Sequence, residues 1–328
     1  MLKIPQIIGH DAQLEQLAQD RKTGNVVHAY LFSGPRHLGK MSIARWFALE
    51  LLSADMSPEE RTKVRNQVER LVHPDLLVLD QLWVEGECED WDLLAKTSNI
   101  PQQHRAKKPG AKTDSISIED IRVLQERLYE TGSGKWRCCI IRSVERMQDA
   151  AANAFLKILE EPPPGLVFLL TTQSLPTLLP TVISRARICA FHRLAPQEIK
   201  PLLQSVSADD AQFIAHLAQG APGTVIQLRD NPDFLREQRL AHSRALSFWR
   251  SRKPKERLGL LSPLLQRGEE SDQFLTHLSL ALREEMLHTS PQNVRALVEL
   301  TEGLRSNAHR QLLTQQFVLT VSSVPTSV

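Results

Sequence analysis

Paired cysteines, net charge and long apolar runs are all scarce in this 328-residue chain. None of its four cysteines forms a Cys-x-x-Cys pair, so we expect buried, reduced thiols and no thiolate metal centre. A net charge of only +2 is too small to indicate nucleic-acid binding by overall charge, so only a local basic patch could support such a contact. No apolar run reaches about 18 residues, and residues 1–6 lack a signal-peptide pattern. We therefore expect a cytoplasmic protein that does not contact a membrane.

The chain does have the composition of a globular protein with an ample core, with 41% hydrophobic and 24% charged residues. Its length fits two or three domains. Apolar runs alternate with helical patterns as far as residue 191, which predicts an α/β domain with a parallel sheet over 1–193. Only helical patterns follow, and they predict a small helical domain over 194–244 and a helical bundle over 245–328.

Several helix boundaries can be read directly from the sequence. Capping boxes at Ser57 and Ser117 mark two helix starts. Gly220 and Gly223 are expected to separate helices, and Pro196, Pro232 and Pro291 to begin them. The predicted core of the C-terminal bundle consists of Leu260, Leu261, Leu264, Leu265, Leu275, Leu278, Leu282, Leu312, Leu313, Phe317 and Leu319.

Residues 81–115 are predicted to be an insertion in the α/β domain. Acidic residues fill its first half and basic residues its second, with no apolar period. The basic half is consistent either with a contact to DNA phosphates or with a solvated loop.

A glycine-rich stretch, GPRHLGKMS at 34–42, lies between an apolar run and a helical pattern, which is the setting of a phosphate loop. Gly34 and Gly39 can adopt backbone angles closed to other residues, and Lys40 would reach the outer phosphates. Such loops have Ser or Thr directly after the lysine to ligate Mg²⁺, but here Met41 occupies that position. A thioether is a poor ligand for a hard cation, so we predict that the loop lacks a metal ligand.

Six stretches together resemble a known family, the AAA+ clamp-loader subunits of bacterial DNA polymerase III, most closely those of the delta-prime type. The matching stretches are IGH at 8–10, HAYLFSGP at 28–35, HPD at 73–75, IEDIR at 118–122, NAFLKILEEPP at 153–163 and PTVISR at 180–185. The resemblance implies an α/β P-loop domain, a small helical lid at 194–244 and a C-terminal collar at 245–328. It also implies sister subunits in a hetero-oligomeric ring that loads a sliding clamp onto primed DNA.

The chain departs from the active members of this family at each position that handles magnesium or senses nucleotide. Where they have Asp and Glu, this chain has Arg142 and Ser143. Gly223 occupies the place of the sensor arginine. A cation at a magnesium position repels the metal, by about 4 kcal/mol for unit charges about 4 Å apart at an effective dielectric of 20. Many relatives carry a four-cysteine zinc module, but no cysteine lies between Ser33 and Glu87, so zinc is not expected.

The resemblance also implies an arginine finger donated to the neighbouring subunit from a Ser-Arg-Cys motif. Here Ala186 replaces the cysteine but Arg185 remains, so Arg185 is the predicted catalytic group in trans. The alternative is an ordinary surface arginine. For Gly34, Gly39 and Lys40 two interpretations stay open, a weak ATP or ADP site and a relic that only orders the loop.

We therefore expect a subunit that requires no cofactor and does not hydrolyse ATP. Two other readings remain, an active motor subunit of the gamma/tau type and an unrelated AAA+ DNA-repair ATPase. The first predicts turnover by the isolated chain, and the second leaves the 153–163 motif unexplained.

Overall fold

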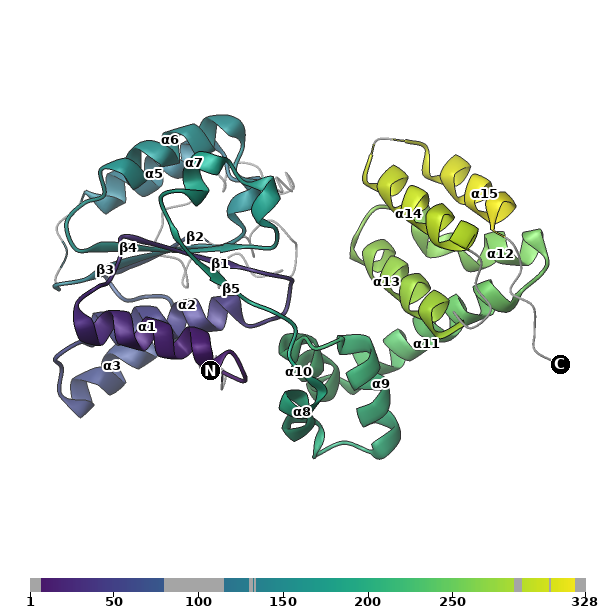
Figure 1. Ribbon diagram of the computed structural model, residues 1–328, viewed down its shortest axis with the longest axis horizontal. Helices are drawn as coiled ribbons and strands as arrows, with labels where there is room; N and C mark the ends of the chain where they lie inside the picture. Colours follow the sequence, from purple (N-terminus) through teal and green to yellow (C-terminus); the bar gives the residue numbers. More distant parts are fainter. Residues whose placement is uncertain are drawn as a thin grey trace. The chain divides into compact units, whose positions relative to one another are not determined.

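Figure 1 presents the computed structural model, which describes residues 7–79, 115–129, 132, 134–285, 291–306 and 308–321. All but the last residue of the predicted insertion, and Cys88 with it, lie outside the described residues. The chain divides into two compact units, Met1–Val225 and Ile226–Val328.

The first unit alternates strands and helices through most of its length, as the apolar runs predicted. Its described elements are α1 (Asp11–Thr23), β1 (Ala29–Ser33), α2 (Lys40–Leu52), α3 (Pro58–Glu69), β2 (Leu76–Leu79), α5 (Ile118–Leu128), β3 (Arg137–Ile141), α6 (Asp149–Glu160), β4 (Leu166–Thr172), α7 (Pro180–Ile183), β5 (Arg187–Ala190), α8 (Pro196–Ile199), α9 (Ala208–Ala218) and α10 (Pro222–Asp230). Short 3-10 helices lie at Val144–Arg146, Leu175–Thr177 and Lys200–Leu203. Both predicted capping boxes form, at the starts of α3 and α5.

The described strands form one five-stranded sheet in the order β2-β3-β4-β1-β5, and every neighbouring pair is parallel. At the centre of β1, Leu31 lies opposite Leu170 on one side and Ile188 on the other. The predicted parallel α/β architecture is confirmed. Because all strands run the same way, the residues that follow them gather at one edge of the sheet and those that precede them at the other.

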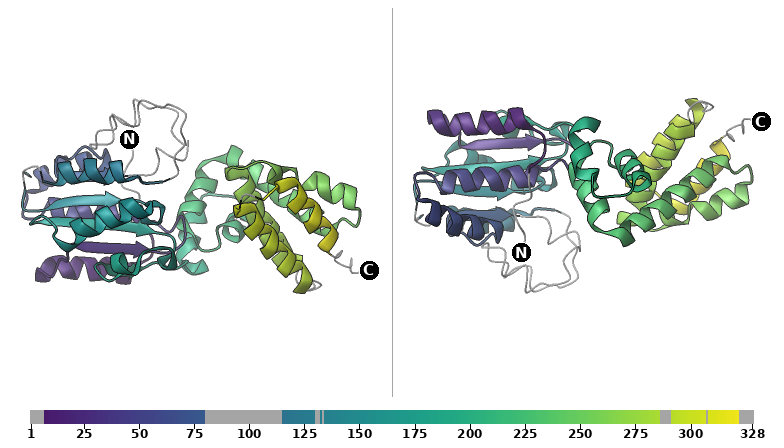
Figure 2. Two further views of the ribbon diagram at one scale, coloured as in Figure 1. Left: turned by 90° about the horizontal axis from the view of Figure 1, so that it is seen from above. Right: turned by 90° about the horizontal axis from the view of Figure 1, so that it is seen from below.

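Both faces of the sheet are covered, which explains why the strands are apolar without alternation. Helices α1, α2 and α3 cover one face, and α5, α6 and α7 cover the other (Figures 1 and 2). Successive side chains of a strand enter different cores, so Tyr30 packs toward α1 and α2 while Leu31 packs toward α6. The adjacent Cys138 and Cys139 likewise lie in opposite cores, and burial raises the pKa of both thiols. As predicted, they cannot share one metal.

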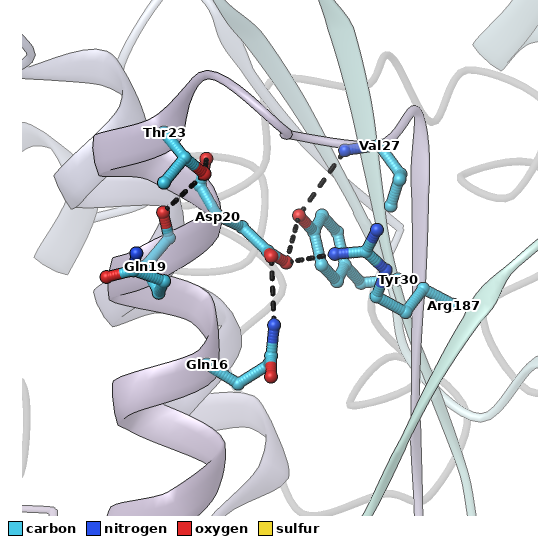
Figure 3. A network of polar contacts seen from close by, with 7 residues as sticks. All are labelled: Gln16, Gln19, Asp20, Thr23, Val27, Tyr30 and Arg187. Atoms are coloured by element: carbon cyan, nitrogen blue, oxygen red, sulfur yellow. Dashed lines mark hydrogen bonds and ion pairs between the residues drawn. The ribbon is translucent and has the colours of Figure 1, made fainter.

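A buried carboxylate ties α1 to two strands (Figure 3). One oxygen of Asp20 accepts hydrogen bonds from the Tyr30 hydroxyl, at 2.9 Å, and from Arg187 Nη1, while the other accepts from Gln16 Nε2 at 3.0 Å. The Val27 amide donates to the Tyr30 oxygen at 3.3 Å. Asp20 is 4% exposed, so these donors replace its lost hydration. They fix β1 and the edge strand β5 against α1.

The second unit is helical, as predicted. Its described elements are α11 (Pro232–Arg250), α12 (Pro254–Leu260), a 3-10 helix at Ser262–Leu265, α13 (Glu269–Glu284), α14 (Pro291–Arg305) and α15 (Arg310–Thr320). Aromatic rings fill the centre of its core: Phe248 stacks on Phe317 with centroids 5.4 Å apart, and Trp249 Nε1 donates to the Leu278 carbonyl at 2.9 Å. None of the described helices of the chain is long and apolar enough to cross a membrane.

Three leucines predicted to lie in this core are exposed instead: Leu265 at 45%, Leu312 at 63% and Leu319 at 80%. The reason in α15 is angular. Leu312 and Leu319 are seven residues apart and share one helix face, whereas Phe317 and Val318 face the core from the opposite side. An apolar residue at helical spacing indicates a face but not which face is inward.

The predicted domain boundaries stay predictions. The two units of the structure meet at 225/226, inside α10, and α11 continues as one 19-residue helix through the predicted boundary at 244/245.

The Asp20 network makes a prediction about stability. Asp20→Asn keeps the shape of the side chain but removes the charge that Arg187 and Tyr30 bind, so the free energy of unfolding should fall by about 1.5–3 kcal/mol. Glu15→Gln removes an exposed charge from the same helix and should change it by less than about 0.5 kcal/mol. Urea denaturation of the two variants tests this, and equal midpoints would show that the buried charge adds nothing.

Candidate functional site

The glycine-rich loop connects β1 to α2, as predicted, and both of its glycines are needed for backbone reasons. Gly34 has φ 147° and Gly39 has φ 86°, which is the left-handed region. A Cβ at Gly34 would lie 2.3 Å from the Phe191 carbonyl oxygen, so no side chain fits there. The Gly34 amide donates to the Thr172 carbonyl at 3.2 Å, which joins the loop to the end of β4.

Lys40 is the first residue of α2 and is 9% exposed. Its ammonium donates to the carbonyl oxygens of Gly34 and Pro35, so the lysine folds back over its own loop. Burial lowers the pKa of Lys40 to about 8. The nearby carboxylate of Glu145 opposes this shift, and the charges of Arg142 and Arg36 add to it.

Two further elements of the first unit bind the loop through its carbonyls. The Gly223 amide donates to the His37 carbonyl at 2.8 Å, and His10 Nε2 lies 3.1 Å from the Leu38 carbonyl. Burial lowers the pKa of His10, which favours the neutral ring with Nε2–H as the donor. With the bonds of Lys40, the carbonyls of Gly34, Pro35, His37 and Leu38 all have donors from this chain.

Gly223 lies inside α10 and not between helices, so that prediction was wrong. The segment still contains a break: Gly220 precedes α10 with φ 86°. A Cβ at Gly223 would lie 2.9 Å from the His37 carbonyl oxygen, because the first turn of α10 packs directly on the loop. The glycine at the sensor position is therefore also a packing requirement, which the sequence did not indicate.

Arg142 and Ser143 follow β3 at the same edge of the sheet as the loop. The Arg142 amide donates to Leu79 O at 3.0 Å, and the Ser143 amide to Thr171 Oγ1 at 3.0 Å. Ser143 has φ 57°, so the chain turns sharply here. Arg142 is the residue that the clamp-loader resemblance sets at a magnesium position, and its positive charge adds to the lowering of the Lys40 pKa.

Sequence reasoning missed one carboxylate in this region. Glu145 lies in the 3-10 helix after β3, and its Oε1 accepts a hydrogen bond from the Gln173 amide at 3.2 Å. The Gln173 side chain in turn accepts from Arg36 Nε at 3.0 Å. Glu145 is two residues beyond the predicted base position, so a motif count alone does not find it.

Arg185 lies elsewhere. It follows α7, and β5 begins two residues later, so it belongs to the amino-terminal edge of the sheet, whereas Lys40 lies beyond the carboxyl end of β1. Strands β1 and β5 are parallel neighbours, and the five residues of β1 span about 17 Å. Arg185 Nη2 lies 2.7 Å from Glu160 Oε1, and its side chain is 34% exposed. The two predicted groups are thus at opposite edges of one domain.

Comparison with known proteins agrees with this fold and these motifs. The family model described as DNA polymerase III, delta subunit matches residues 9–195, more than half of the chain. Among curated proteins, the delta' subunit of DNA polymerase III from Bacillus subtilis is 26% identical over 327 residues, with 89% of this chain and 90% of the relative covered. The gamma/tau subunit from Mycobacterium bovis is 28% identical over 234 residues.

Coverage differs between these relatives. The match to the mycobacterial gamma/tau subunit takes in 69% of this chain but only 36% of the relative, so the chain spans about a third of that protein. Among solved structures, a gamma subunit-related protein from Thermotoga maritima has a TM-score of 0.52 and 20% identity, with 94% of this chain and 97% of that one covered, which supports the fold. The resemblance inferred from the six sequence stretches is confirmed: the chain belongs to the DNA polymerase III delta subunit family.

Proposed function

We propose that the chain is a delta-prime-like clamp-loader subunit that does not hydrolyse ATP and donates Arg185 to the nucleotide of a neighbouring motor subunit. Its family membership supports a clamp-loader-type role in DNA replication. Within that role it works in a hetero-oligomeric ring of sister subunits, which loads the sliding clamp onto primed DNA. The observation that carries the proposal is the separation of Arg185 and Lys40 at opposite edges of a parallel sheet.

The separation matters because an arginine finger must touch the transferring phosphoryl group. Arg185 would have to cross the length of β1 to reach a phosphate held by its own loop. A phosphate that another subunit holds at the amino-terminal edge would lie at the same edge of the sheet as Arg185. Arg185 is partly exposed and follows the PTVIS segment, as expected of a side chain that contacts a neighbouring subunit.

The proposal that this chain does not hydrolyse ATP rests on the residues around its glycine-rich loop, which are poor ligands for Mg²⁺. Met41 brings no hydroxyl next to the lysine, and Arg142 brings a positive charge close to it. The residues here do not fit Mg²⁺, so no step of hydrolysis is assigned to it. We propose a vestigial loop that holds ATP or ADP weakly at most, with Arg142 and Lys40 as the groups that neutralise phosphate charge.

We also propose that residues 194–244 serve as the lid and residues 245–328 as the collar that contacts sister subunits. The exposed Leu312 and Leu319 on one face of α15 offer apolar side chains for such a contact.

The first test is ATP turnover by the isolated chain, which should be indistinguishable from background. Measured phosphate release that Lys40→Ala abolishes would contradict the proposal and favour the motor-subunit reading. Loss of such turnover in Glu145→Gln would then identify Glu145 as the base in place of the position that Ser143 occupies.

The second test concerns nucleotide affinity. Without a metal ligand, affinity for ATP should be nearly independent of Mg²⁺, and a steep rise with Mg²⁺ would show that Arg142 does not occupy the metal position. The pKa of Lys40 is lowered to about 8, so the free loop carries the positive charge below that pH and loses it above. Affinity should therefore fall by about tenfold between pH 7 and pH 9. Calorimetric titration measures it, and Lys40→Met should remove this dependence.

The third test is Arg185→Ala in a complex reconstituted with the sister subunits. ATP hydrolysis at the adjoining motor site should slow by a factor on the order of 10³, and clamp loading should be impaired. Arg185→Lys should be nearly as poor, because an ammonium cannot reproduce the planar fork of a guanidinium. The stability of the chain itself should change by no more than about 1 kcal/mol, the range of a surface ion pair.

Arg65→Ala is the matched control, since Arg65 is an exposed arginine on α3, and it should leave the rate unchanged. Size-exclusion chromatography must show intact complexes in each case. An assembled Arg185→Ala complex with unaltered hydrolysis and loading would exclude Arg185 as the finger.

A further inference from the structure

The guanidinium of Arg185 is held by two elements of its own chain. Nη2 forms an ion pair with Glu160 Oε1 at 2.7 Å, and Nη1 donates to the Thr181 carbonyl at 3.1 Å, with Ser184 Oγ at 3.5 Å. Glu160 is the last residue of α6, and Thr181 belongs to α7. An exposed arginine that only faced solvent would have neither partner.

The backbone of Arg185 is anchored to the same pair of helices. Its amide donates to the Val182 carbonyl at 3.3 Å, which closes the last turn of α7. The Val182 side chain is 5% exposed and packs in the core that α6 covers, together with Phe155 and Ile158. The backbones of Arg185 and Glu160 therefore belong to elements that pack on one core, so the ion pair joins two side chains whose backbones do not move independently.

These three contacts leave part of the guanidinium available. Arginine has five N–H donors in a fixed plane. Among the described contacts, the Nε–H and one Nη2–H of Arg185 remain uncommitted. Arg185 can thus keep Glu160 as a partner and still donate to an anion in front of it.

We propose that Glu160 is a positioning residue that holds Arg185 in the rotamer needed to reach the neighbour's phosphate. This inference rests on the function proposed above and names a second residue for it. A free arginine side chain loses rotamer entropy when it is fixed, and if it were fixed only in the transition state, that loss would raise the activation free energy. With Glu160 in place, the side chain is ordered when the chain folds. Glu160 acts through Arg185 and touches no substrate.

The test uses the reconstituted complex with Glu160→Gln, which keeps an oxygen at the same place but removes the charge. The kcat of the adjoining motor site should fall roughly two- to fivefold, the fold-change that corresponds to a surface ion pair. The KM for ATP should stay unchanged, because the motor subunit binds the nucleotide. Glu161→Gln is the matched control, since Glu161 is the next residue, is also exposed and makes no ion pair with the described residues. It should leave kcat unchanged.

The pair of variants Glu160→Gln and Glu160→Gln/Arg185→Ala separates positioning from a structural role. If Glu160 acts through Arg185, its substitution should have no further effect once Arg185 is alanine. If Glu160→Gln lowers kcat equally with Arg185 and with Ala at position 185, Glu160 does not act through Arg185 and the proposal is overturned. A higher kcat in Glu160→Gln alone would also overturn it, because the ion pair would then hold Arg185 away from the phosphate. If Arg185→Ala slows hydrolysis but Glu160→Gln does not, only the positioning role fails. If Arg185→Ala has no effect, the proposed function fails with it.

Discussion

The parallel direction of the strands is the constraint on which the arrangement of this domain depends. Strand β1 pairs with β4 and β5 in the same direction, so whatever follows these strands meets at one edge of the sheet and whatever precedes them meets at the other. The glycine-rich loop and Arg142 share the first edge, and Arg185 and the turn at 162–165 before β4 share the second. A domain with two dissimilar edges suits a subunit that has a different neighbour on each side.

Sequence reasoning succeeded where local chemistry decides the structure. The apolar run at 76–79 became a strand because both of its faces are buried, and the Ser57 and Ser117 capping boxes formed because all their atoms lie within four residues. It failed where a distant partner decides. Asp20 binds Arg187, 167 residues later, and no local pattern marks that pair. The exposed leucines of α15 fit a helical period equally well on either face.

The candidate site shows the same division. The loop glycines and Lys40 are local and lie where the motif puts them, and Arg142 follows β3 at the same edge of the sheet. Glu145, Gln173 and the packing of Gly223 on His37 depend on how β3, β4 and α10 approach the loop. His10 carried a weak signal, because it belongs to the IGH stretch that resembles the family, but only the fold brings its ring to Leu38.

The closeness of Gly34 to the Phe191 carbonyl gives the glycine a structural role that is independent of nucleotide. Any residue but glycine would collide with that backbone oxygen whether or not nucleotide is bound, so selection for the fold alone retains the glycine. The same holds for Gly223 against His37. In this chain, the intact glycine-rich loop is therefore explained by the fold and is a poor indicator of catalysis. The informative positions are the two at which this chain lacks the expected magnesium ligand: the residue after the lysine, Met41, and the first residue beyond β3, Arg142.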